Sequence, residues 1–194
     1  MKLTLESLWS LDEYERQRAQ FRASVMDHKK HRTVILGEHL RLQFEDELTL
    51  RYQIQEMLRI EKIHDVKDVQ AEWTTYGSLL PDVDNWQATL MIEYGDPVVR
   101  KQRLQLLRSI EERVYLQVEG GAKIVPIANE DMQRTRADKT SAVHFLRFPV
   151  SRENRDKLLA GARLGAGVEH PEYTVKLDWL SEEIRQSLLM DGVT

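Results

Sequence analysis

The chain has 194 residues, of which 41% are hydrophobic and 31% charged, and its formal net charge is -4. This composition is typical of a globular protein and excludes a disordered chain. Because there is no cysteine, disulfides, iron–sulfur ligation, thiolate zinc sites and a thiol nucleophile are all excluded.

Charge and hydropathy predict a cytoplasmic protein without a membrane span. The N-terminal residues become charged before any apolar core of signal-peptide length, and no window approaches the roughly 18 to 20 apolar residues of a membrane helix. Charges of both signs are interspersed and the net charge is negative, so we expect no nucleic-acid partner, and the lack of an apolar span predicts no membrane partner.

The first predicted helix runs from Leu11 to about His28, because Ser10 and Glu13 fit a capping box. It ends in the basic run HKKHR, residues 28–32, where a helix C-terminus favours cations. Two alternatives stay open for this run. One is a metal clip of histidines at i, i+3 spacing, and the other is contact with an anion or nucleic acid.

A β-hairpin is predicted next, with strands 33–36 and 39–44 joined by a Gly-Glu turn. The stretch from Asp46 to His64 follows, and it is the longest run without Gly or Pro that carries a helical apolar stripe. The stripe spans a sector of roughly 160°, which predicts a core-facing helix packed against a sheet. Its members are Leu50, Ile54, Met57, Leu58 and Ile60.

The second half of the chain alternates between helix and strand signals. Capping residues, prolines and apolar periodicity predict helices at 66–79, 97–112, 151–160 and 183–189. Alternation of apolar and polar residues predicts strands at 86–94, 114–119, 122–128, 142–150 and 173–177. We expect polar residues 129–140 to form a loop or a short helical turn, and small residues 161–171 to form a loop.

Strands joined by hairpins as well as by helices predict an α+β fold. We expect a mainly antiparallel sheet with helices packed on one face or end. No repeat and no long linker divides the sequence, so residues 1–194 are predicted to form a single domain.

Glu61 and His64 have the Glu-x-x-His spacing with which ferritin-like bundles bind paired iron. Such a site needs two of these motifs and two further glutamates, and only one motif occurs here. A partly buried Glu-His pair at a helix end is therefore the favoured interpretation, with a metal site as the alternative.

Gly161, Gly165 and Gly167 have a spacing seen in dinucleotide-binding turns, but those turns follow a strand and open a helix. Here the motif follows a predicted helix, which favours a helix C-cap and a flexible loop. We therefore expect no cofactor.

Ser141 and His144 lie at i, i+3 on a predicted strand, so their side chains point to opposite faces and the imidazole cannot activate the hydroxyl. His144 is interpreted as a hydrogen-bonded sheet histidine. His170 is a better candidate for function because loops expose their side chains. No catalytic residue is assigned and no metal is expected, but Glu61, His64, His144 and His170 are the candidates if a metal binds.

Four segments of the chain resemble an uncharacterised bacterial family, domain of unknown function 3501. They are EDELTLRYQIQEMLRIEKI (45–63), NWQATLMIEY (85–94), DKTSAVHFLRF (138–148) and GVEHPEY (167–173). The family has no established activity whose residues could be transferred. The resemblance implies a context, since its members are often encoded beside rubrerythrin-like proteins and iron–sulfur oxidoreductases.

Two functions from different classes follow. The first is an accessory or binding protein of an iron-dependent redox system, without its own redox centre, whose partner is another protein such as those encoded beside it. The second is an enzyme or a metal- or cofactor-binding protein whose His/Glu site is assembled from distant segments such as Glu61, His144 and His170. Homo-oligomerisation stays open in both.

Overall fold

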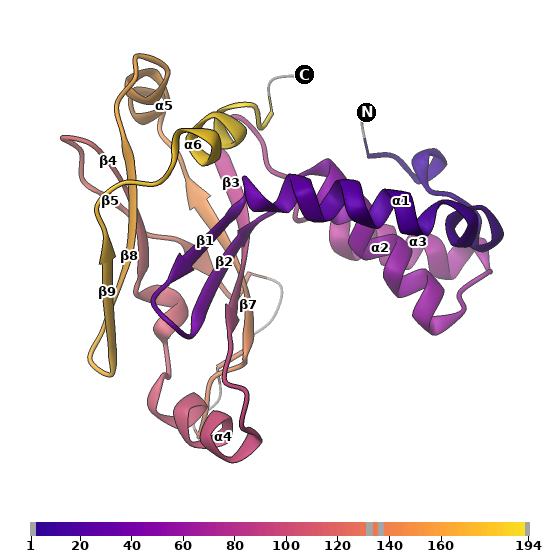
Figure 1. Ribbon diagram of the computed structural model, residues 1–194, viewed down its shortest axis with the longest axis horizontal. Helices are drawn as coiled ribbons and strands as arrows, with labels where there is room; N and C mark the ends of the chain where they lie inside the picture. Colours follow the sequence, from indigo (N-terminus) through magenta and orange to yellow (C-terminus); the bar gives the residue numbers. More distant parts are fainter. Residues whose placement is uncertain (1–2, 131–133, 136–137, 193–194) are drawn as a thin grey trace. The chain divides into compact units, whose positions relative to one another are not determined.

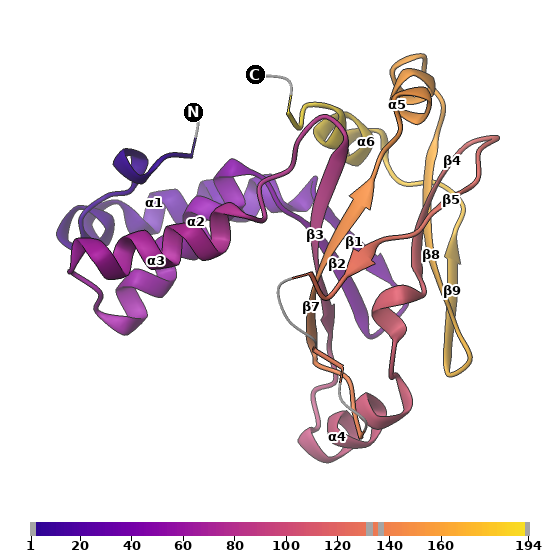
Figure 2. The same cartoon turned by 180° about the vertical axis from the view of Figure 1, so that it is seen from behind.

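The computed structural model describes residues 3–130, 134–135 and 138–192. It confirms the α+β class, and every strand pair in the described residues is antiparallel. The chain forms two compact units (Figures 1 and 2). We call Met1–His31 with Glu45–Pro81 the helical unit, and Arg32–Phe44 with Asp82–Thr194 the sheet unit. That the whole chain behaves as one domain stays a prediction.

Three α-helices lie side by side in the helical unit (Figure 1). A short 3-10 helix, Leu5–Ser7, precedes α1 (Leu11–Lys30), α2 (Glu47–Glu61) and α3 (Val66–Gly77). Leu50, Ile54 and Leu58 of α2 are buried, and they pack with residues from the other two helices and from the flanking segments. The residues that pack with them are Leu3, Leu8, Leu11, Ile63, Val69, Trp73, Tyr76, Leu79 and Leu80.

The predicted packing of this helix against a sheet is therefore wrong. The core that α2 joins is made by helical-unit residues, and the side chain of Ile60 at the edge of the stripe is 62% exposed. An apolar stripe predicts an apolar neighbour, but a pair of helices can supply that neighbour as well as a sheet can.

Glu56 holds α1 against α2 from the polar side of the stripe. Its carboxylate accepts hydrogen bonds from Tyr14 Oη at 2.6 Å and from the guanidinium of Arg18 at 2.6 and 3.0 Å. The Arg18 guanidinium, together with the Tyr14 hydroxyl, lowers the pKa of Glu56 to about 2. The ionised carboxylate is therefore part of the folded helical unit.

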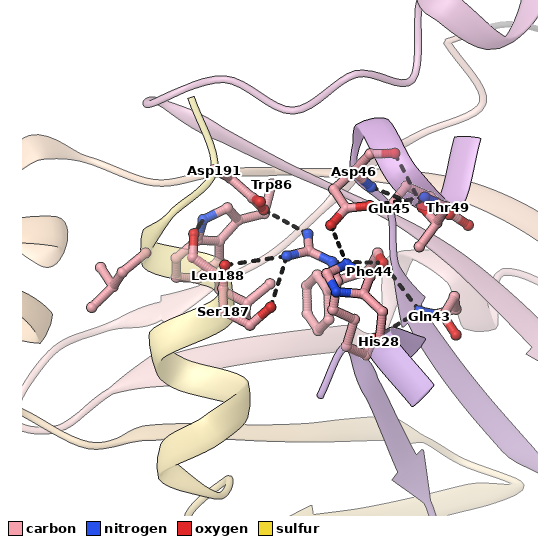
Figure 3. Close-up of polar contacts among 12 residues, drawn as sticks. His28, Gln43, Phe44, Glu45, Asp46, Thr49, Trp86, Ser187, Leu188 and Asp191 are labelled. Carbon is pink, nitrogen blue, oxygen red and sulfur yellow. Dashed lines mark hydrogen bonds and ion pairs between the residues drawn. The ribbon is translucent and has the colours of Figure 1, made fainter. Parts of the chain in front are cut away.

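The basic run at the end of α1 lies where it was predicted, with His28, Lys29 and Lys30 in the last turn. His28 Nε2 lies 2.5 Å from Asp46 Oδ2, and Asp46 is the N-cap of α2 (Figure 3). Asp46 Oδ1 accepts a hydrogen bond from the backbone N–H of Thr49 at 2.9 Å. His28 therefore joins the end of α1 to the start of α2, while an anion or nucleic-acid contact of this run stays a prediction.

The sheet unit contains two antiparallel sheets with the strand orders β1-β2-β3-β7-β6 and β5-β4-β8-β9. Buried residues of both sheets share one hydrophobic core. Helices α5 and α6 lie at one end of the strands and α4 at the other (Figures 1 and 2). The strands are β1 (Thr33–Leu36), β2 (Leu40–Phe44), β3 (Asn85–Ile92), β4 (Val114–Val118), β5 (Lys123–Ile124), β6 (Ile127–Ala128), β7 (Val143–Pro149), β8 (Leu164–His170) and β9 (Tyr173–Leu177). The helices are α4 (Pro97–Leu106), a 3-10 turn η2 (Ile110–Glu112), α5 (Arg152–Leu159) and α6 (Glu182–Leu189).

Three predictions of local structure need correction. The predicted loop 161–171 is mostly the strand β8, paired on both sides. The predicted strand 122–128 is two short strands in different sheets, because Pro126 interrupts it. The predicted helix 97–112 ends at Leu106, and Ser109 adopts a left-handed conformation before η2. Part of the predicted loop 129–140, residues 131–133 and 136–137, lies outside the described residues.

Arg32 connects the start of the hairpin to the C-terminal helix. Its side chain is 1% exposed, and its guanidinium donates to Asp191 Oδ2 at 2.7 Å and to the backbone oxygen of Ser187 at 3.2 Å. It also donates to Phe44 O at 3.2 Å, and Trp86 Nε1 donates to Leu188 O at 2.9 Å (Figure 3). These side chains add donors to the last carbonyls of α6, which also accept from the backbone N–H groups of Met190 and Asp191.

We predict that Asp191→Ala destabilises the sheet unit by about 3–5 kcal/mol, because it leaves the buried guanidinium of Arg32 without its carboxylate. Denaturant unfolding followed by circular dichroism measures the change. Asp156→Ala is the matched control, since the Asp156 carboxylate is 66% exposed, and little change is expected there. Equal stabilities of the two variants would contradict a buried ion pair.

A second prediction concerns acid stability of the helical unit. The pKa of Glu56 is lowered from 4.5 to about 2 in the folded state, so its contribution is complete above about 4.5 and is lost as the pH falls towards 2. Glu56→Gln should cost roughly 1–2 kcal/mol at pH 7, an amount that allows for partial solvent screening. Denaturant unfolding between pH 7 and pH 3 should show the two proteins converging, and a constant difference would contradict this.

Candidate functional site

Glu61 and His64 do not share a helical face. Helix α2 ends at Glu61, and its C-cap Lys62 adopts the left-handed conformation with φ 54°. His64 lies after the helix, and both candidate side chains are exposed. The i, i+3 geometry that the predicted metal pair requires is therefore absent, because the helix stops three residues before the predicted end.

His144 lies in β7 and is 1% exposed, as expected of a hydrogen-bonded sheet histidine. Its Nε2 contacts Thr140 Oγ1 at 2.9 Å and the backbone oxygen of Ser141 at 3.1 Å. The Ser141 hydroxyl accepts instead from the backbone N–H of Val143. The imidazole thus contacts the Ser141 backbone and not its side chain.

A buried carboxylate, Glu111 in η2, completes a network around His144. Thr135 Oγ1 donates to Glu111 Oε1, and Thr140 Oγ1 lies 3.4 Å from Glu111 Oε2. The two threonine hydroxyls are 2.8 Å apart, and His144 Nε2 lies 3.8 Å from Glu111 Oε2. Glu111, Thr140 and His144 are each 1% exposed. No local pattern in the sequence distinguishes Glu111, Thr135 or Thr140.

The partners determine the direction of the hydrogen bonds. A carbonyl oxygen only accepts, so the contact with Ser141 O assigns a proton to His144 Nε2. This proton is shared with Thr140 Oγ1, whose own proton then points to Thr135 Oγ1. Thr135 in turn donates to the Glu111 carboxylate. The result is a chain of hydrogen bonds that runs in one direction, from the His144 imidazole to the Glu111 carboxylate. Such a chain suits proton transfer, and it also stabilises a buried carboxylate.

His170 lies at the end of β8 and is 7% exposed, which corrects the expectation of an exposed loop histidine. Its Nε2 lies 2.9 Å from the backbone oxygen of Arg108, an acceptor, so Nε2 carries a proton. Its Nδ1 accepts from the backbone N–H of Glu172 at 3.2 Å. Both ring nitrogens are engaged with backbone, so His170 is neutral here and fixes the positions of two loops. A metal would have to displace one of these bonds.

A pocket of about 410 Å³ opens beside this histidine and the buried network. Its volume is within the roughly 300–1,000 Å³ typical of small-molecule sites. We call it the β8-end pocket, and it is lined by Arg108, Ser109, Arg113, Thr135, His170 and Pro171. Thr135 belongs both to the pocket wall and to the hydrogen-bond chain that reaches Glu111.

The glycine motif serves packing in the sheet. Gly161 follows α5 with φ 99°, as a helix C-cap does, whereas Gly165 and Gly167 lie in β8. A Cβ on Gly167 would meet the Tyr115 hydroxyl at 2.4 Å, and one on Gly165 would meet the Asp178 backbone oxygen at 2.6 Å. These glycines allow close approach of neighbouring groups, and the helix N-terminus that a dinucleotide-binding turn needs does not follow them.

Within residues 3–130, 134–135 and 138–192, no group of three or more His, Asp or Glu side chains is arranged to hold a metal ion. In the same residues no helix combines the length and the apolar composition needed to cross a membrane. The absence of a cofactor stays a prediction.

We predict that nitrogen-15 NMR of histidine-labelled protein finds a proton on Nε2 of His144 and the neutral Nε2–H tautomer of His170, because their Nε2 atoms face backbone carbonyls. Thr140→Val should change the signal of the His144 ring and cost about 1–3 kcal/mol of stability, since His144 Nε2 and Thr135 Oγ1 lose the buried hydroxyl that joins them. Thr174→Val is the control near His170. An Nδ1–H tautomer at His144 would contradict the proposed direction of the chain.

Comparison with known proteins agrees with the resemblance seen in the sequence. A family model described as "Protein of unknown function (DUF3501)" matches residues 2–191. A crystal structure of a novel protein of unknown function from Burkholderia pseudomallei K96243 is 48% identical to this chain. The match covers 97% of this chain and 98% of that chain, with a TM-score of 0.92. No curated protein matches. The chain belongs to the DUF3501 family of proteins of unknown function.

Proposed function

We propose that the chain is a cytoplasmic accessory protein that binds another protein and serves an iron-dependent redox system without a redox centre of its own. The observation that carries the binding role is the exposed, basic and partly apolar surface of α4. The redox context comes from the family resemblance, which suggests rubrerythrin-like proteins and iron–sulfur oxidoreductases as partners.

Helix α4 contributes little to the core of the sheet unit. None of its residues is buried, and it is anchored by the partly buried Leu104 and by the buried Leu107 that follows it. Its apolar residues Val98 and Leu106 are 67% and 50% exposed. Val98 therefore lies outside the core, because the helix lies beyond the end of the strands (Figure 1).

The charge on this helix has one sign. Residues 97–106 contain three cations and no acidic residue, although the whole chain has a net charge of -4. We define the α4 surface as the exposed residues Val98, Val99, Arg100, Lys101, Arg103 and Leu106. Arginine beside apolar side chains is typical of protein interfaces, and a basic surface favours an acidic partner through faster association. The proposed occupant is therefore an acidic surface of the partner protein.

We predict that the double variant Lys101→Glu/Arg103→Glu weakens binding to such a partner at least about tenfold, because two attractive charges become repulsive. The matched control is Arg16→Glu/Arg22→Glu on α1, two exposed cations with the same change of net charge. Co-purification with rubrerythrin-like proteins and iron–sulfur oxidoreductases, the partners that the family resemblance suggests, followed by titration at two salt concentrations, measures binding.

Equal weakening by both double variants would show that net charge alone matters and would contradict the α4 surface. Failure to recover any complex with the wild-type chain at low salt would contradict the binding role itself. Elemental analysis and a visible spectrum of the purified chain test whether it has a redox centre of its own. A stoichiometric amount of iron, zinc or haem would overturn the proposal that it has none.

A second candidate function is favoured by the hydrogen-bond chain between His144 and Glu111. A directed chain of hydroxyls that passes through the pocket-wall residue Thr135 to Glu111 suits an enzyme that moves a proton, and it is assembled from distant segments. Turnover of a small substrate that is lost in Thr140→Val but retained in the α4 double variant would favour this function over the first.

A further inference from the structure

We propose that the sheet unit binds a small zwitterionic amino acid in a pocket on the outer face of the sheet β5-β4-β8-β9. We call it the Trp179 pocket, and its lining includes Tyr115, Gln117, Gly165, Lys176, Asp178 and Trp179. This ligand site goes beyond the protein-binding role of the α4 surface and shares no residue with it. It depends on polar groups that the chain itself leaves unused, on their opposite charges and on the size of the pocket.

Strand pairing places the lining on the face that points away from the shared core. That core takes alternate residues of β4 and β8, so Tyr115 and Gln117 face the other side. They lie opposite Gly167 and Gly165, and Gly167 also pairs with Lys176 of β9. Because glycine has no side chain, β8 leaves room between the side chains of β4 and β9, and the Trp179 pocket lies there.

The hydroxyl of Tyr115 is the first unused polar group. This residue is 4% exposed, and within residues 3–130, 134–135 and 138–192 its hydroxyl has no hydrogen-bond partner. A buried tyrosine usually has such a partner, because an unpaired hydroxyl has lost its bonds to water. The ring lies against Gly167, where a side chain would collide with the hydroxyl. A ligand in the pocket would supply the missing partner.

Two side chains of opposite charge line the same pocket without meeting each other. Lys176 and Asp178 lie two residues apart and are exposed, and no ion pair or side-chain hydrogen bond engages either of them in the part of the chain that the structure describes. Gln117 donates through Nε2 to Gly121 O at 2.9 Å, so its Oε1 is an acceptor for the pocket. The lining therefore offers an ammonium and a hydroxyl to a carboxylate, and a carboxylate and an amide oxygen to an ammonium group.

The aromatic walls of the pocket are fixed before a ligand arrives. The guanidinium carbon of Arg163 lies 4.1 Å from the ring centre of Trp179, and Lys123 Nζ lies 4.3 Å from that of Tyr115. Each of these two cations is also paired with a glutamate. They are thus engaged already, and Lys176 is left as the cation that meets the ligand. Fixed walls reduce the entropy that is lost on binding.

The volume restricts the ligand to few atoms. The Trp179 pocket measures about 60 Å³. Since one water needs roughly 10–15 Å³ of cavity volume, the pocket has room for about four to six non-hydrogen atoms. Glycine and alanine have this size, whereas drug-sized ligands occupy sites of roughly 300–1,000 Å³. The size and the two opposite charges together point to a small amino acid.

The test is a titration of the full chain with glycine and L-alanine, followed by calorimetry and by amide NMR. Acetate and methylammonium each carry only one of the two charges, and L-tryptophan exceeds the volume, so these three are the comparison ligands. We expect saturable binding of glycine or L-alanine, with shifts at residues 115–117, 165–167 and 176–179, and at least about tenfold weaker binding of the comparison ligands. No saturable binding of either amino acid, or equal binding of any comparison ligand, would overturn the proposal.

Tyr115→Phe separates ligand binding from folding. It removes a hydroxyl that no described residue engages, so the thermal unfolding temperature should not fall, whereas glycine binding should weaken at least about tenfold. Tyr173→Phe is the contrasting control, because the Tyr173 hydroxyl donates to Leu36 O at 2.8 Å. That variant should unfold at a lower temperature and bind glycine as the wild type does.

Lys176→Gln and Asp178→Asn test the two charges and should each weaken glycine binding at least about tenfold. Both side chains are exposed, so thermal unfolding should not change and serves as the check on folding. Lys67→Gln and Asp68→Asn on α3 are the matched controls, since these residues are exposed and undergo the same changes of charge. Wild-type affinity in either pocket variant or in Tyr115→Phe would overturn the site, and so would an equal loss of binding in the α3 variants.

Discussion

The buried guanidinium of Arg32 is the constraint on which the sheet unit depends. A charge that is 1% exposed is costly unless it is paired, and here it is paired by Asp191, almost at the end of the described chain. The same side chain donates to the last turn of α6, and Trp86 and Arg155 satisfy the neighbouring carbonyls of that turn. The folded core around Trp86 therefore joins residues that lie far apart in the sequence.

Close packing in the sheet β5-β4-β8-β9 depends on two glycines of β8. Gly165 and Gly167 have no side chain, so the ring of Tyr115 and the backbone at Asp178 lie against β8. The strand that results ends at His170, whose ring contacts the backbone of Arg108. The position of the β8-end pocket is thus a consequence of strand pairing, because the same strand that fills the sheet also holds the arginine-bearing turn.

The sheet unit presents two separate cationic features. The α4 surface lies on a helix that has no buried residue, and it combines exposed apolar and basic side chains. The β8-end pocket is small and lies against a buried network that links Glu111 to His144. The first suits an acidic protein surface, and the second has the volume of a small-molecule site.

Local rules of the sequence determined the α+β class, the hairpin at Gly37, the capped helices and the buried face of β3, because each depends on neighbours a few residues apart. They also identified His144 as a sheet histidine. Only the tertiary structure decided that α2 packs on helices, that the glycine-rich segment is a strand, and that Glu111 meets His144 across 33 positions of sequence. Those outcomes depend on partners distant in the chain, for which no local spacing exists.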